Sequence, residues 1–207
     1  MIRTMALAAL LVAGFTVNAA EEAAPKADPA KGKVLAESIC VACHGVDGNS
    51  PTALYPHLAN QGEAYLIKQL QAFKSGARVD PVMSGMAATL VDDAAVRDVS
   101  AWYASQQAKP APATNESLIA RGKQLWRAGD AAKGVPACSG CHGPAGKGLP
   151  AQYPRLAGQH PEYTETQLKR FRLGERANDP EQMMRTISAR LSDADMKAVS
   201  EYAAGLR

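Results

Sequence analysis

The chain has 207 residues, of which 46% are hydrophobic and 21% are charged, and its formal net charge at pH 7 is +3. A net charge this modest gives no indication of nucleic-acid binding. After the N-terminal segment described next, about 187 residues remain, which suits one ordinary domain or two small ones.

The first 20 residues predict an export signal. A short charged start, Met1-Ile2-Arg3, precedes an apolar run from about Ala6 to Val17 and then the small residues Ala19 and Ala20. This order is typical of a cleaved secretory signal peptide. The apolar run has about a dozen residues, fewer than the roughly 20 that cross a bilayer. We therefore expect a periplasmic mature protein that is soluble or only peripherally bound to a membrane.

The first half of the mature chain, residues 21–108, predicts helices around a cysteine motif. Asp28-Pro29 is a helix start, with Asp as the N-cap and Pro at the first helical position. This helix leads into the motif Cys40-Val41-Ala42-Cys43-His44. Apolar residues at helical spacing predict a further helix over Glu63 to Lys74. Ser75 to Leu90 is expected to be irregular, and Asp92-Asp93 begins a last helix.

Two Cys-x-x-Cys-His motifs indicate the chemistry of the chain. Each sulfur can add to a haem vinyl group, and the adjacent imidazole then lies under the iron, so the motif is typical of c-type haem attachment. Thioredoxin-like redox chemistry, a structural disulfide or a zinc site explains the cysteines but leaves the two following histidines to chance. We predict two covalently bound haem c groups, attached to Cys40, Cys43, Cys138 and Cys141.

The second motif belongs to an internal repeat. A polar stretch with two prolines, Gln106 to Asn115, suits a linker, which we place at residues 109–115. Beyond it, the cysteine motif, a Tyr-Pro pair and the apolar positions of one helix recur 98 residues after their first appearance. The chain is thus predicted to be an all-α tandem duplication, with domains at residues 21–108 and 116–207.

Charge is distributed unevenly between the halves. The net charge is −2 over residues 20–109 and +4 over residues 110–207. Such asymmetry either orients the protein toward a charged partner at low salt or reflects ordinary solvated surfaces.

The repeat also selects among the candidates for the second axial ligand of each iron. His57 and His160 fall opposite Arg155 and Gly62, so neither is reproduced in the other half. We interpret both as ordinary surface or hydrogen-bonding histidines.

Methionine is the better candidate, because one methionine recurs in both halves. Met83 precedes Leu90 by seven positions and Met184 precedes Leu191 by seven, whereas the other three methionines of the mature chain have no methionine counterpart. We predict that the axial ligands are His44 with Met83 and His142 with Met184. An iron closed by His and Met has no open site, and the thioether raises its potential, so such a centre transfers electrons rather than catalysing a reaction.

From about Asp28 to Leu206 the chain resembles the class I cytochromes c, and specifically the dihaem cytochrome c4 group. The resemblance rests on the two cysteine motifs, the Tyr-Pro pairs, and the segments Val82–Met86 and Met183–Arg185. It implies two tandem class I cytochrome c domains whose haems face one another. It further implies four local contacts: Gly32 and Gly122 at helix crossings against Trp102 and Tyr202, and carbonyls of Pro56 and Pro154 that accept the proximal imidazole N–H.

The resemblance also implies partners. We expect a carrier that takes electrons from a bc1-type complex and delivers them to a terminal oxidase. The alternative is an electron-accepting subunit of a periplasmic dehydrogenase, such as a flavoprotein sulfide dehydrogenase. An enzyme such as a dihaem peroxidase is disfavoured, because both irons are predicted to be closed by methionine.

Overall fold

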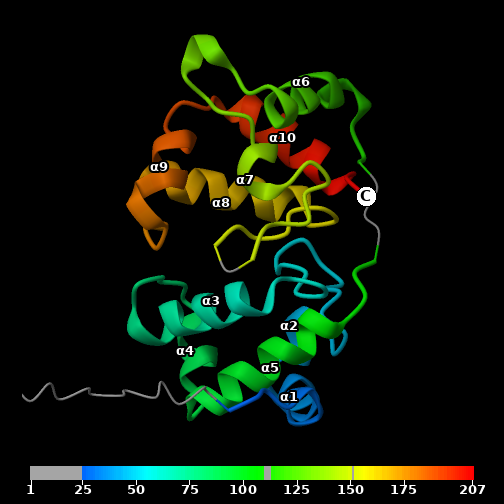
Figure 1. Cartoon of the computed structure of the whole chain (residues 1–207), viewed down its shortest axis with the longest axis vertical. Helices are drawn as coiled ribbons and strands as arrows, with labels where there is room; N and C mark the ends of the chain where they lie inside the picture. The colour runs from blue at the N-terminus through cyan, green and yellow to red at the C-terminus, as the bar shows by residue number, and fades with distance from the viewer. Residues whose placement is uncertain (1–24, 110–112, 151) are drawn as a thin grey trace, which may run out of the picture.

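A computed structural model describes residues 25–109, 113–150 and 152–207. These residues form two helical halves stacked along the long axis of the molecule, as Figure 1 shows. The predicted signal peptide and part of the predicted linker, residues 110–112, lie outside the described ranges. Within those ranges, no helix has both the length and the apolar character needed to cross a bilayer.

The N-terminal half has one nearly continuous helical stretch at its start and three later helices. Its elements are α1 (Pro29–Leu35), the π-helical turn η1 (Ala36–Cys40), α2 (Val41–His44), α3 (Glu63–Ser75), α4 (Met83–Ala88) and α5 (Asp93–Ser105). The predicted start of α1 is confirmed, since Asp28 accepts from the backbone N–H of Ala30 at 2.9 Å and Pro29 is the first helical residue.

The C-terminal half repeats this plan with local differences. Its elements are α6 (Glu116–Arg127), the 3-10 turn η2 (Ala131–Lys133), α7 (Ser139–His142), α8 (Pro161–Leu173), the 3-10 turn η3 (Pro180–Gln182), α9 (Met183–Ser188) and α10 (Asp193–Ala204). Eight positions separate Gly32 from Cys40, but sixteen separate Gly122 from Cys138. The additional residues form a turn closed by a bridge between Asp130 and Val135.

The two methionine segments differ from the sequence-based expectation. We expected residues 75–90 to be irregular, but Met83–Ala88 is the helix α4, and Met183–Ser188 is its counterpart α9. Asp80 stabilises the start of α4 by accepting from the backbone N–H of Met83 at 3.1 Å. The expectation failed because a helix of six residues carries too little periodic pattern to be recognised.

Each half is closed by the crossing of its first and last long helices. A Cβ atom added to Gly32 would lie 2.0 Å from the carbonyl oxygen of Asp98, and one added to Gly122 would lie 2.2 Å from that of Ala198. Glycine is therefore required where α1 meets α5 and where α6 meets α10. This confirms the crossings implied by the family resemblance, including the contacts with Trp102 and Tyr202.

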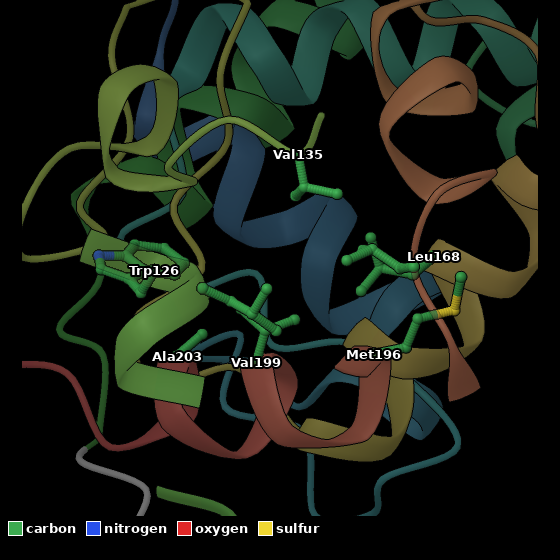
Figure 2. Close-up of a cluster of buried hydrophobic side chains, with 8 residues drawn as sticks. Trp126, Val135, Leu168, Met196, Val199 and Ala203 are labelled. Carbon is green, nitrogen blue, oxygen red and sulfur yellow. The ribbon is translucent and has the colours of Figure 1, made fainter. Parts of the chain in front are cut away.

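A separate hydrophobic core fills each half. Figure 2 shows the core of the C-terminal half, where Trp126 from α6 lies near Val199 and Ala203 from α10, and Val135 projects from the loop that precedes α7. Trp126 is 1% exposed, and its indole N–H donates to the carbonyl of Pro144 at 3.1 Å. The corresponding core of the N-terminal half contains Ala36, Leu66, Leu90, Val96, Val99 and Tyr103.

The two halves are joined by reciprocal hydrogen bonds between glutamine side chains and the opposite backbone. The amide group of Gln61 donates to the carbonyl of Arg155 at 3.0 Å and accepts from its N–H at 2.8 Å. Gln159 does the same at His57, with distances of 3.0 and 2.9 Å. Because Gln61 and Gln159 are 98 positions apart, the interface has an approximate two-fold symmetry inherited from the duplication.

Candidate haem sites

One cavity of about 1050 Å³ extends between the two halves. Its volume is slightly above the roughly 300–1,000 Å³ typical of a site for one small molecule. The cavity brings together both cysteine motifs and both methionine segments, since its lining includes Cys40, Cys43, His44, Cys138, Cys141, His142, Met83, Met86, Met183 and Met184. Residues far apart in sequence, contributed by both repeats, thus line one space.

The motif histidines are oriented by backbone carbonyls. The ring Nδ1 of His44 lies 2.9 Å from the carbonyl oxygen of Pro56, and that of His142 lies 3.0 Å from the carbonyl oxygen of Pro154. Because a carbonyl only accepts, Nδ1 carries the proton and Nε2 keeps its lone pair. Burial lowers the pKa of both rings, which favours this neutral form. Each imidazole is therefore prepared to bind a metal through Nε2.

The four motif cysteines are partly buried, and no disulfide joins them. Burial is the main cause that raises the pKa of Cys40, and it raises the pKa of Cys138 to about 11. Catalytic redox cysteines have the opposite property, because their pKa is lowered to favour the reactive thiolate. The environment of Cys40 and Cys138 therefore disfavours the thioredoxin-like alternative.

The methionine segments have the same burial pattern when aligned at an offset of 101. Residues 83–90 and 184–191 follow one sequence of buried, half-buried and exposed positions, ending on Leu90 and Leu191, which are 3% and 5% exposed. This alignment pairs Met83 with Met184. All four methionines of α4 and α9 line the cavity, so their position in the lining does not distinguish the ligands from their neighbours. Axial ligation by Met83 and Met184 therefore stays a prediction.

Two buried arginines form a network across the interface that we did not predict. Arg78 donates to Gln69 of its own half at 2.8 Å and to Gln167 of the other half at 2.9 Å. Arg176 mirrors it, donating to Gln167 at 2.9 Å and to Gln69 at 3.1 Å. Tyr163 and Tyr65 complete the network as acceptors from Arg78 and Arg176 at 3.1 and 2.9 Å. All six residues recur at the offset of 98, which was the available signal in the sequence.

The charge of this network identifies what the cavity can hold. Arg78 and Arg176 are 7% and 6% exposed, and the partners named above are all neutral. Although burial alone would raise it, the guanidinium charges lower the pKa of Tyr163. Buried cations are costly unless an anion compensates them. A haem group carries carboxylates and a large apolar ring, so the residues that line this cavity fit two haem groups.

The structure corrects our interpretation of two histidines. We expected His57 and His160 to be ordinary surface or hydrogen-bonding residues, but their rings stack on each other across the interface, with centroids 3.9 Å apart. His57 Nδ1 and His160 Nε2 are buried, and neither has a hydrogen-bond partner within the described part of the chain. Sequence reasoning missed the pair because its members are unrelated by the repeat.

Comparisons with known proteins agree with this site. The family model described as cytochrome c matches twice, at residues 29–107 and 119–206. Cytochrome c4 of Thiocapsa roseopersicina is 47% identical over 190 residues, covering 90% of this chain and 97% of its own. The thiosulfate dehydrogenase electron acceptor of Thiomonas intermedia (strain K12) is 42% identical over 168 residues, with coverages of 80% and 77%. The crystal structure of reduced recombinant cytochrome c4 from Pseudomonas stutzeri superimposes with a TM-score of 0.83 at 41% identity, covering 87% of this chain and all of that one.

Proposed function

Since the chain belongs to the cytochrome c family, as a member of its dihaem cytochrome c4 group, we propose that it transfers electrons in the periplasm from a bc1-type complex to a terminal oxidase. The chain is an electron-transfer protein with two haem c groups, and its function requires redox partner proteins. The observation that supports the proposal most strongly is the shared cavity, because it places both cysteine motifs at one interface. Electrons can then pass between the two sites within one molecule.

Each type of residue in the cavity has a separate task. The haem groups supply the iron that changes oxidation state. Cys40, Cys43, Cys138 and Cys141 would hold them through four thioether bonds. His44 and His142 would bind the iron through Nε2, with the ring orientation fixed by the proline carbonyls. Met83 and Met184 would supply the remaining ligands, and the buried Arg78 and Arg176 would offer their guanidinium groups to the haem carboxylates.

A second candidate function is favoured by one of the relatives. The Thiomonas protein is named as the electron acceptor of a thiosulfate dehydrogenase, and it matches both halves of this chain at 42% identity. The alternative is therefore that this chain accepts electrons from a periplasmic dehydrogenase. This is the same kind of role as the electron-accepting subunit of a flavoprotein sulfide dehydrogenase, which the family resemblance implied.

Rates with isolated partners distinguish the two candidates. The oxidised holoprotein is mixed in a stopped-flow instrument with a reduced bc1-type complex or with a thiosulfate dehydrogenase and its substrate. The reduced holoprotein is mixed with a terminal oxidase. Fast reduction by the bc1-type complex and fast oxidation by the oxidase support the carrier. Fast reduction by the dehydrogenase alone supports the alternative and contradicts the carrier.

We expect the native mature protein to retain two haems after denaturation, because all four cysteine sulfurs are bonded to them. Intact mass spectrometry of protein prepared from the periplasm measures this directly, and it also shows whether the chain begins near Glu21. The double variant Cys138→Ala/Cys141→Ala should retain one haem. A native protein with one haem or none would contradict the assigned attachment sites.

We expect electron transfer between the two haems to persist at high salt, whereas transfer to a charged external partner slows as salt rises. Among the described residues, one ion pair, Asp80–Arg170 at 3.0 Å, crosses an interface whose other hydrogen bonds each have at least one uncharged partner. Exposed charges are screened beyond about 8–10 Å at physiological ionic strength, so salt acts on long-range association. Stopped-flow reduction over a salt series separates the steps. An equally steep fall of both rates would contradict this docking mechanism.

A further inference from the structure

The rings of His57 and His160 come from opposite sides of the domain interface and stack on each other, although the two positions are not related by the repeat. His57 lies in the loop that follows α2, and His160 is the N-cap of α8. Their ring planes are 25° apart with centroids 3.9 Å apart. The backbone of His57 is also hydrogen-bonded to the side chain of Gln159, the residue next to His160. The His57 N–H donates to it at 2.9 Å, and the His57 carbonyl accepts from it at 3.0 Å. The pair is therefore part of the contact that docks the two halves.

This arrangement suits neutral rings and opposes charged ones. An imidazolium carries an N–H on both nitrogens. Charging both rings would bury an N–H on His57 Nδ1 and another on His160 Nε2, and the described residues offer no acceptor to either. A buried donor without an acceptor is destabilising. Two stacked cations would in addition repel each other at close range.

The charged groups around the pair add further positive charge. Lys109 and Arg155 line the same crevice as His57. The carboxylate that acts on His57, Asp47, is already paired with Lys109 at 3.2 Å. The pKa of His57 is lowered to about 4, and burial is the largest cause. The charges of His160 and Lys109 lower the pKa further, whereas the charge of Asp47 raises it.

From this geometry we infer that His57 and His160 form an acid-sensitive latch, which holds the two halves docked while the stacked rings are neutral and releases them when His57 becomes charged. The direction follows from proton linkage. The separated halves would bind a proton at His57 near pH 6.5, whereas the docked form binds it only near pH 4. Docking is thus fully favoured above about pH 6.5 and weakens as pH falls toward 4, by at most about tenfold per pH unit for one proton.

Amide hydrogen exchange tests the latch in the reduced holoprotein, observed by NMR between pH 4 and 7. The backbone N–H groups of His57 and Arg155 are the probes, because both donate across the interface. The N–H of Asn60, which donates to Tyr103 within one half at 3.0 Å, is the internal reference. We expect the protection of the two probes, corrected for intrinsic exchange, to fall up to about tenfold per pH unit while that of Asn60 stays constant.

The control variant is His57→Phe/His160→Phe, which keeps two stacked aromatic rings but removes both imidazole groups. Protection of the probes should then be independent of pH, while haem absorption confirms that iron ligation is unchanged in both proteins. A pH response that persists in the variant would assign the effect to another group and overturn the inference. If the variant does not assemble, titration of the His57 ring in the unaltered protein decides, because an ordinary value near 6.5 would equally overturn it.

Discussion

Replacing Met184 by Ala is expected to lower the potential of the C-terminal haem and to open its iron to external ligands. The thioether favours ferrous iron, so its loss stabilises the ferric state. Axial ligands set haem potentials over about 0.8 V, and we expect a fall on the order of 100 mV or more. Met83→Ala should have the same effect on the N-terminal haem alone. Potentiometric titration, together with cyanide or imidazole binding, measures both consequences.

Two neighbouring methionines provide matched controls for this experiment. Met86 and Met183 line the same cavity and lie on the same short helices as the predicted ligands. Their replacement by Ala removes a side chain of equal size without removing a ligand, so both haems should keep their Met–iron absorption. Loss of that absorption in Met86→Ala or Met183→Ala, with the predicted ligands intact, would show that the alignment at an offset of 101 is wrong.

The parts of the molecule that were predictable are those that the duplication repeats. The glycine crossings and the orientation of His44 and His142 recur in both halves, and the helix start at Asp28 follows from its own capping residues. Local sequence is sufficient for such features, because capping, spacing and close helix contact each require particular residues at fixed separations.

The features that sequence reasoning missed depend on contacts between the halves. Arg78 and Arg176 repeat at the common offset. Each donates hydrogen bonds to both Gln69 and Gln167 because α3 and α8 lie opposite each other, an arrangement that the sequence does not give (Figure 1). The stacking of His57 on His160 has no repeated signal at all. An interface combines residues from different positions of the two repeats, so an alignment of the repeats does not reveal it.

Gly122→Ala is expected to destabilise the C-terminal half severely. The new Cβ would lie 2.2 Å from the carbonyl oxygen of Ala198 and 2.6 Å from the Cβ of Tyr202. The close oxygen belongs to the backbone of α10, so no side-chain rotation relieves the clash and the helices must separate. Overpacking costs typically 1–3 kcal/mol, and a backbone clash belongs at the upper end, at about 3 kcal/mol. For a domain of this size the midpoint of thermal unfolding should fall by more than about 10 °C.

Gly85→Ala is the matched control, because a Cβ at this exposed helical position would meet nothing within 4 Å. Ala is favoured over Gly inside a helix by roughly 0.5–1 kcal/mol, so this variant should be unchanged or slightly more stable. Circular dichroism at 222 nm, recorded during heating of the holoprotein, compares the three proteins. Equal midpoints for Gly122→Ala and the unaltered chain would contradict the close crossing of α6 and α10. In that case Gly122 would be dispensable for the packing that encloses the second haem.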